Sequence, residues 1–346
     1  MRSLGTNRAS NGGSALILAL WIVILLSLIV GFFAFEMHVE ARITSCCRKR
    51  LKADYLAKAA VERARQLLVK CADPDIKKDD TFKDKDAPWY YYAKHLALGG
   101  SVEGYSEELD GGTLSLAIVP EPALRNVNRL DRNDWERIFD VAGIPEGNWD
   151  DLIDCFEDWK DADNVPLRYG AETEDYYKTL DPPYQAKNGP LFTVEELLLI
   201  KGFTPAMLYG GLPEDAAEDE TPMSGMRDLL TVYGDGKVNV NAASERVLMT
   251  LPSVDELAAQ GIIDERTGVE ETDQTKDKSF ENEADFFTRF PNLSSTLQNR
   301  IITGSEVYRI TATGNSHGVA REISCIASVN RSTGVMTVLR WTESEL

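Results

Sequence analysis

The chain has 346 residues, which is enough for two or three domains of ordinary size. Hydrophobic residues make up 43% and charged residues 27%, the balance of a globular protein with a packed core. The formal net charge of -19 gives a surface that repels phosphates, which argues against DNA or RNA binding. Five scattered cysteines exclude a disulfide scaffold, although Cys71 and Cys155 would pair if the fold brought them together. Three histidines far apart in the sequence give little support to a zinc site.

An uncharged apolar segment covers residues 14–35. A run of about 20 apolar residues spans a bilayer as a helix, whereas the apolar core of a signal peptide has roughly 7–15. From Glu36 to Leu68 there is no glycine or proline, and apolar residues recur at helical spacing. We therefore expect one helix over residues 14–69, about 80 Å long. Its first half would lie in the membrane, and its second half would pack an apolar stripe on a soluble domain.

The basic residues around this segment bear on its orientation. Arg2 and Arg8 precede the span, and five basic residues follow it: Arg42, Arg48, Lys49, Arg50 and Lys52. By the positive-inside rule alone, this count favours a cytoplasmic C-terminal side.

Four segments have the alternation and composition of β-strands. The first covers residues 113–119, and three more lie near the C-terminus at residues 307–313, 320–329 and 335–341. Turn-forming residues separate the last three, which predicts an antiparallel sheet. The polar composition of residues 72–110, rich in Asp, Lys and Gly, predicts loops on both sides of one short helix at 88–98. The expected fold class is α+β, a pilin-like long N-terminal helix packed on a small antiparallel sheet.

About 180 residues with helical patterning separate the first strand from the last three, which predicts a large helical domain inserted into the sheet. Val127–Leu130 and Val238–Ala243 each precede a helical stretch and look related. Thr193–Thr204 has the rhythm of a helix, a glycine turn and a helix, similar to a helix-hairpin-helix element. The negative charge favours packing over DNA binding for such units. The acidic residues 213–224 and 270–284 predict solvated loops.

These elements divide the chain into five expected regions. They are a leader at 1–13, the transmembrane and assembly helix at 14–70, a region with the first strand at 71–127, the inserted helical domain at 128–303, and the C-terminal strands at 304–346.

The densest group of carboxylates lies between residues 158 and 175. Asp161 and Asp163 are one residue apart in an expected loop, and three more acids follow a turn at Gly170, namely Glu172, Glu174 and Asp175. Carboxylates this close repel one another unless they are solvated or a hard cation neutralises them, and calcium takes roughly six to eight oxygen ligands. The spacing is not that of an EF-hand. One alternative is a solvated acidic loop.

A second alternative is a membrane-anchored, metal-dependent hydrolase that uses these acids. The sequence contains no nucleophile elbow, Walker loop or Rossmann fingerprint. A dense acidic group also fits cation binding better than the paired acids of a glycosidase.

Several motifs stand in a fixed order along the chain. Gly13-Ser14 precedes the apolar helix as in a type IV prepilin signal, and Leu18 stands where most pilins carry a glutamate. D-W-x-D-x-D at 158–163, N-G-P at 188–190 and N-x-N-A-A at 239–243 follow. Together these features resemble the minor pseudopilin K family of type II secretion systems, and the resemblance covers nearly the whole chain.

The resemblance implies a non-enzymatic, single-pass inner-membrane protein whose globular part lies in the periplasm, the opposite of the charge-based orientation. It implies cleavage by a prepilin peptidase after Gly13, with Gly12 as the alternative, and methylation of Ser14. The implied role is a tip component that helps initiate pseudopilus assembly. The implied partners are the I- and J-type minor pseudopilins, the major pseudopilin and a secreted substrate. The family's bound calcium carries over to Asp161, Asp163, Glu172, Glu174 and Asp175.

Overall fold

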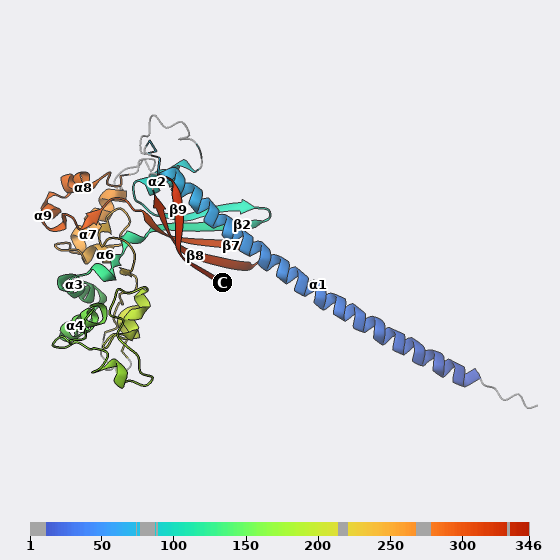
Figure 1. Ribbon diagram of the computed structural model, residues 1–346. Helices are drawn as coiled ribbons and strands as arrows, with labels where there is room; N and C mark the ends of the chain where they lie inside the picture. The colour runs from blue at the N-terminus through green and yellow to red at the C-terminus, as the bar shows by residue number, and fades with distance from the viewer. Residues whose placement is uncertain are drawn as a thin grey trace, which may run out of the picture.

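The computed structural model describes residues 12–73, 75–76, 87, 89–213, 221–267, 278–330 and 333–345. It contains a long N-terminal helix, a five-stranded antiparallel sheet and a largely helical region inserted between two of the strands (Figure 1). This arrangement confirms the expected α+β class. Residues 1–11 of the expected leader lie outside the described residues.

Helix α1 runs without interruption from Gly12 to Cys71, as the sequence predicts. Its first half projects away from the rest of the molecule (Figure 1), and its apolar side chains from Leu16 to Phe35 are exposed on every face. Among the described residues, α1 is the one helix long and apolar enough to cross a membrane. A helix that exposes apolar side chains all round is stable only in lipid or among similar helices.

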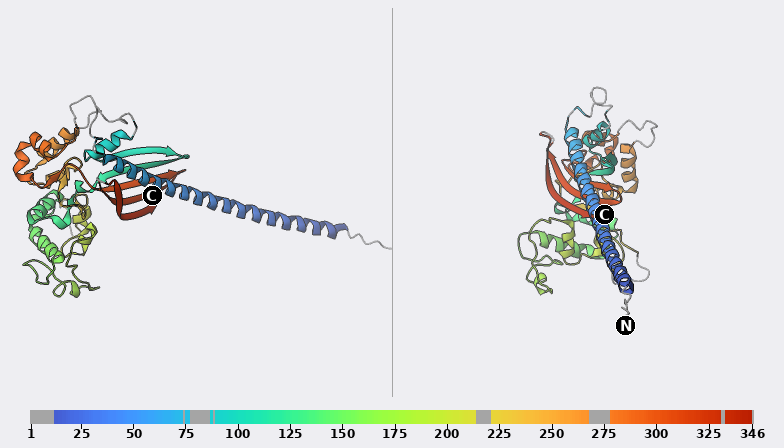
Figure 2. Two further views of the ribbon diagram at one scale, coloured as in Figure 1. Left: turned by 45° about the horizontal axis from the view of Figure 1, so that its top comes forward. Right: turned by 90° about the vertical axis from the view of Figure 1, so that its right-hand side faces the viewer.

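The second half of α1 lies along one face of the sheet (Figure 2). Small side chains line the buried side of the helix at helical spacing: Ala53, Ala57, Ala60 and Ala64. They let the backbone of the sheet come close, and the closest approach is at Gly314. A Cβ atom at Gly314 would lie 2.1 Å from the carbonyl oxygen of Ala53 and 2.4 Å from the amide nitrogen of Ala57.

The sheet has the strand order β1-β2-β7-β8-β9, and every neighbouring pair is antiparallel. The expected first strand and the three expected C-terminal strands are all confirmed. Their bounds are Gly112–Pro120 for β2, Val307–Ser316 for β7, Val319–Asn330 for β8 and Val335–Glu345 for β9. The helix expected near residues 88–98 is α2, Tyr90–Ala97.

The prediction of a loop between α2 and β2 is wrong, because strand β1 occupies Val102–Leu109. This strand forms one edge of the sheet, and Val102 is its one buried side chain. An edge strand that faces solvent on both sides has no apolar alternation, so the usual sequence signal for a strand is missing.

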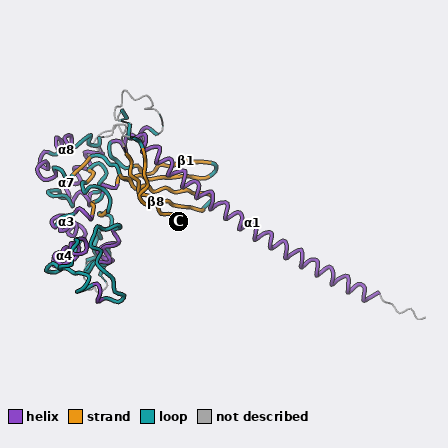
Figure 3. The backbone as a smooth tube through the Cα atoms, viewed as in Figure 1, coloured by secondary structure: helices purple, strands orange, loops and turns teal. Residues whose placement is uncertain are grey.

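The inserted region lies between β2 and β7 and has its own core, separate from the core between α1 and the sheet. Its longer helices are α3 at Arg132–Ala142, α4 at Trp149–Lys160 and α7 at Glu256–Thr267. Loops and short elements connect them (Figure 3). The short helices and 3-10 turns are η1 Glu121–Ala123, η2 Val127–Arg129, η3 Glu146–Asn148, η4 Tyr177–Thr179, η5 Val194–Leu199, α5 Pro205–Tyr209, α6 Glu245–Met249, α8 Glu283–Arg289, η6 Pro291–Leu293 and α9 Ser294–Leu297. Two short parallel ladders pair β3 Arg125–Asn126 with β4 Leu230–Thr231, and β5 Val238–Asn239 with β6 Ile301–Ile302.

The segments near residues 127–130 and 238–243, which look related in the sequence, each contain a pair of asparagines that make the same hydrogen bonds. Asn126 accepts a hydrogen bond from the backbone amide of Asn128, and Asn239 accepts one from that of Asn241. The second asparagine of each pair then holds a distant backbone segment with both ends of its side-chain amide. Asn128 bonds the amide and carbonyl of Leu191, and Asn241 bonds those of Phe280. The two segments therefore share one hydrogen-bond arrangement.

The segments that start at Leu191 and Phe280 also lead into a helical turn with the same kind of hydrogen bond, from backbone amides to an acidic side chain. Glu196 accepts hydrogen bonds from the amides of Phe192 and Thr193, and Asp285 accepts one from the amide of Glu281. The prediction of a solvated loop at 270–284 is therefore wrong at Ser279 and Phe280, which are buried, whereas Glu281, Asn282 and Ala284 are exposed. The prediction of a solvated loop at 213–224 is wrong at Met223, which is buried. Residues 214–220 and 268–277 of the two expected acidic loops lie outside the described residues.

Polar contacts join the inserted region to the rest of the protein. Asn239 and Asn241 donate to the carbonyls of Gly99 and Leu98, each at 2.7 Å. At a second contact, the buried carboxylate of Glu121 accepts a hydrogen bond of 2.7 Å from Arg309 in strand β7. Buried polar groups that are fully bonded fix one relative placement of the parts they join.

A disulfide between Cys71 and Cys155 does not form. Neither cysteine is in a disulfide, and both are buried, Cys71 in the core between α1 and the sheet and Cys155 in the core of the inserted region.

The contact at Gly314 predicts the effect of a single methyl group. Gly314→Ala would push α1 away from β7 and lower the free energy of unfolding of the sheet domain by about 1–3 kcal/mol, the usual cost of overpacking. Chemical denaturation of the purified chain in detergent measures this change. Gly147→Ala is the matched control, because a Cβ atom there meets nothing within 4 Å. Equal stability of the two variants would contradict the close packing.

Candidate metal centre

Helix α4 positions the acidic loop that follows it. Asp154 and Asp158 are four residues apart and therefore lie on one face of α4. Asp154 accepts a hydrogen bond of 3.2 Å from the amide of Tyr169, and the fully buried Asp158 accepts one of 3.1 Å from the amide of Leu167. The carboxylates of Asp154 and Asp158 thus hold the loop segment at 167–169 against helix α4.

Gly170 is required at the end of this loop. A Cβ atom at this position would lie 1.8 Å from a carboxylate oxygen of Asp158. The absence of a side chain lets the chain pass Asp158 and bring Glu172 back toward the start of the loop.

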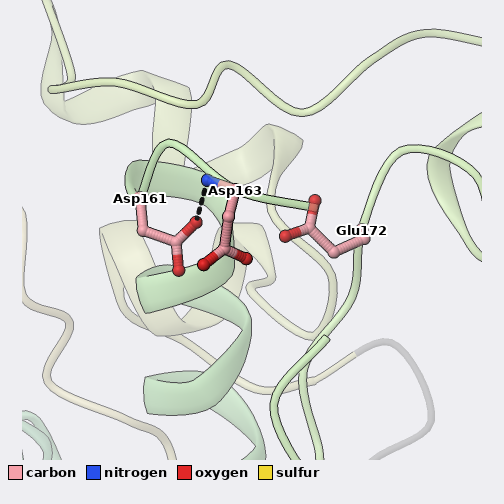
Figure 4. Close-up of side chains that lie close together, drawn as sticks. All are labelled: Asp161, Asp163 and Glu172. Atoms are coloured by element: carbon pink, nitrogen blue, oxygen red, sulfur yellow. Dashed lines mark hydrogen bonds between the residues drawn. The ribbon is translucent and has the colours of Figure 1, made fainter. Parts of the chain in front are cut away.

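Three of the five predicted ligands come together at this point. One carboxylate oxygen from each of Asp161, Asp163 and Glu172 lies within 4.8 Å of the other two (Figure 4). Asp161 also accepts a hydrogen bond of 3.2 Å from the amide of Asp163, which turns the loop so that both aspartates face the same side. The side chain of Glu172 approaches them from a different segment of the chain (Figure 4).

Glu172 is the residue that most needs a cation. Its side chain is 1% exposed, and neither carboxylate oxygen has a hydrogen-bond partner. Burial raises the pKa of this carboxyl, and the nearby carboxylates of Asp158, Asp161 and Asp163 raise it further. An unpaired buried carboxylate costs several kcal/mol unless it gains a proton or a positive charge.

The other two predicted ligands lie outside the cluster. The exposed side chain of Glu174 forms an ion pair with Lys178. Asp175 accepts a hydrogen bond of 2.9 Å from the backbone amide of Glu172, so it fixes the turn that carries Glu172. Glu174 and Asp175 were predicted as ligands because they lie in the same short turn as Glu172.

Asn188 is a candidate that was not included among the predicted ligands. Its side-chain amide nitrogen donates a hydrogen bond of 2.7 Å to the carbonyl oxygen of Asp163, and its buried side-chain oxygen has no partner. The signal in the sequence is the N-G-P motif. Asn188 adopts a positive φ of 47°, a conformation that asparagine tolerates better than most residues.

The donor set fits calcium. The cluster offers carboxylate oxygens only, and Asn188 adds an amide oxygen beside the same loop, as a hard cation requires. An ion held by Asp161, Asp163 and Glu172 would satisfy the unpaired oxygens of Glu172 and cancel the repulsion among the three acids. Its chemical contribution would be charge neutralisation that closes the loop.

Comparison with known proteins agrees with this architecture. A family model described as type II secretion system protein K matches residues 117–213, which include the whole acidic cluster. A type II secretion system protein K of Pseudomonas aeruginosa is 29% identical over 166 residues, 45% of this chain and 45% of that protein. One from Klebsiella pneumoniae is 30% identical over 141 residues, 37% of this chain and 43% of that protein. A protein K of Escherichia coli K12 is 24% identical over 232 residues, 63% of this chain.

A solved structure shares the fold. It is the crystal structure of the GspK-GspI-GspJ complex from the type 2 secretion system of enterotoxigenic Escherichia coli. The match has a TM-score of 0.59 at 14% identity and covers 89% of this chain and all of that chain. The chain therefore has the fold of a pilin-like protein with a helical insertion. Its sequence and fold are similar to those of type II secretion system protein K. The sequence alignments span 66%, 45% and 43% of the curated relatives' lengths.

The geometry separates Glu172 from Glu174 as a ligand. Glu172→Gln would weaken calcium binding at least about tenfold and remove most of the calcium-induced rise in melting temperature, because the buried charge would be lost. Calcium at about a hundredfold excess over its dissociation constant stabilises a native protein by about 2.7 kcal/mol. Thermal unfolding with calcium and with a chelator measures the effect.

Glu174→Gln is the matched control and would keep the full calcium response, because Glu174 faces Lys178. Loss of the response in Glu174→Gln with retention in Glu172→Gln would contradict the assignment.

Proposed function

We propose that this chain is a minor pseudopilin that sits at the tip of a type II secretion pseudopilus and helps to initiate its assembly. The proposal rests on the match of residues 117–213 to the model of type II secretion system protein K, together with the two halves of helix α1. The first half exposes apolar side chains on every face, and the second half forms part of the core of the sheet domain. Such a helix can bundle with like helices through its first half while its second half holds a globular domain above the bundle. The function is structural, without catalysis.

Two features favour the tip over a repeating position. Leu18, exposed in the isolated chain, replaces the glutamate that would pair with the terminal amine of a neighbouring subunit. The inserted region also lies at the end of the molecule farthest from the start of α1 (Figure 1). A bulky domain there would cover the position that the next subunit along the fibre would occupy.

The proposed partners are other pilin-like subunits. The solved relative is described as part of a complex with GspI and GspJ. The corresponding I- and J-type minor pseudopilins are the proposed partners of this chain, together with the major pseudopilin, the prepilin peptidase and a secreted substrate. The proposed location is the inner membrane, with one pass and the globular part in the periplasm.

Calcium has a structural role in this proposal. The cluster of Asp161, Asp163 and Glu172 closes one loop over helix α4 and lies among groups that hold backbone amides. A metal-dependent hydrolase would instead lose a measured hydrolytic activity in Asp161→Ala while keeping its fold.

The processing step tests the class of protein directly. We expect the mature chain, made in the presence of a prepilin peptidase, to begin at a methylated Ser14, because Gly13 directly precedes the uncharged apolar segment 14–35. Mass analysis of the N-terminal peptide measures this end.

Gly13→Val would leave the leader attached, and Gly12→Ala would be processed normally if cleavage follows Gly13. An intact Met1 on the wild-type chain in a strain with active peptidase would contradict the proposed class.

A further inference from the structure

The two edges of the sheet differ in their protection against pairing with another strand. Edge strand β1 carries Glu103, Glu107 and Glu108, and its register with β2 shifts at a bulge between Val102 and Tyr105. Charged side chains and bulges are the usual means by which a protein prevents edge-to-edge pairing.

The opposite edge strand, β9, also has a register shift with its neighbour β8, between Ile326 and Ala327, but it carries no acidic side chain from Val335 to Thr342. Arg340 is the one charged residue between Val335 and Thr342, and this stretch has four exposed large apolar side chains: Val335, Val338, Leu339 and Trp341. On its outer side β9 pairs with no strand of the described residues. A long apolar edge presents a row of backbone amides and carbonyls to any extended segment that matches it.

We propose that the free edge of β9 binds an extended apolar strand of a different pilin-like subunit, which adds to the sheet as a sixth strand. The backbone groups of β9 supply the hydrogen bonds, and its exposed apolar side chains supply specificity through cross-strand pairs. This inference rests on the proposed function, because it assumes that the chain assembles with other pilin-like subunits.

The direction of α1 argues against a second copy of this chain as the occupant. Strand β9 runs opposite to α1, since Gly334 lies beside Val69 at one end and Glu345 pairs with Arg50 at 3.0 Å at the other. Antiparallel pairing of two β9 strands would therefore point the two α1 helices in opposite directions, which one membrane orientation forbids. Parallel pairing of two β9 strands would place the two helices on opposite faces of the joint sheet, away from each other.

A neighbour with its helix parallel and on the same face must offer the edge that corresponds to β1. In this chain that edge is protected by acidic side chains and a bulge, so a copy of the chain is a poor match. A different pilin-like subunit with an unprotected edge satisfies both conditions.

The surface of α1 next to β9 is suited to the same neighbour. A groove between α1, β8 and β9 is lined by the apolar side chains of Leu51 and Ile323 and by charged residues of both signs: Arg50, Asp54, Arg321, Glu322 and Glu343. Leu51 and Tyr55 are 56% and 64% exposed and lie one turn apart on α1. The helix of the neighbouring subunit would pack on these side chains while its strand pairs with β9.

Hydrogen exchange of the full-length chain tests the proposal, measured alone and in complex with the other minor pseudopilins of its secretion system. We expect exchange in the Val335–Thr342 segment to slow by about tenfold or more in the complex, while exchange in β1 stays unchanged. Val338→Lys/Leu339→Lys would weaken the complex by about tenfold or more, because it places two charges on the pairing edge.

The matched control is Ser106→Lys/Leu109→Lys, which adds the same charge to exposed positions of β1 and would leave the complex intact. A complex that forms without protection of β9 overturns this inference and leaves the proposed function standing. Protection of β9 in the chain alone at high concentration also overturns it, in favour of a second copy. Failure to form any complex overturns the proposed function and this inference together.

Discussion

The close packing of α1 on strand β7 is the contact on which the rest of the structure depends. Ala53 and Ala57 lie so near Gly314 that no side chain fits between helix and sheet. Because β7 pairs with β2 from Tyr308 to Asn315, this contact also fixes the two strands that flank the insertion. One helix therefore serves as the core of a globular domain and as an apolar rod outside it.

The insertion adds a second core without disturbing the first. Its asparagine side chains bond backbone groups of the sheet domain, and Glu121 bonds Arg309 in β7, so the two parts are joined by fully bonded polar contacts. The charge is divided between them as well. Residues 121–306 contain 39 acidic and 17 basic residues, a net charge of -22, and the rest of the chain has 17 acidic and 20 basic residues. The negative net charge of the protein thus lies in the inserted region, where the clustered carboxylates favour a bound cation.

Much of this architecture follows from local patterns in the sequence. The apolar run and the helical spacing predict α1 to within two residues at each end, and alternating residues predict β2, β7, β8 and β9. Strand β1 was missed because an exposed edge needs no apolar alternation. At the candidate metal centre the sequence could name five acids but could not choose among them. Glu172 is distinguished from Glu174 and Asp175 by the close approach of the Gly170 backbone to Asp158, which the sequence does not show. The role of Asn188 depends on its contact with Asp163, 25 residues away in the sequence.

In the proposed orientation the globular part lies on the periplasmic side of the membrane, although a count of basic residues favours the opposite side. Two of the five basic residues that follow the span are matched by acids of the sheet domain, Arg50 by Glu345 and Lys52 by Asp110. Labelling of Cys46 and Cys47, the exposed cysteines of α1, by a membrane-impermeant maleimide tests the orientation directly. With the globular part in the periplasm, we expect labelling in intact spheroplasts and none in a Cys46→Ser/Cys47→Ser variant. Labelling that appears only after the inner membrane is broken would contradict it.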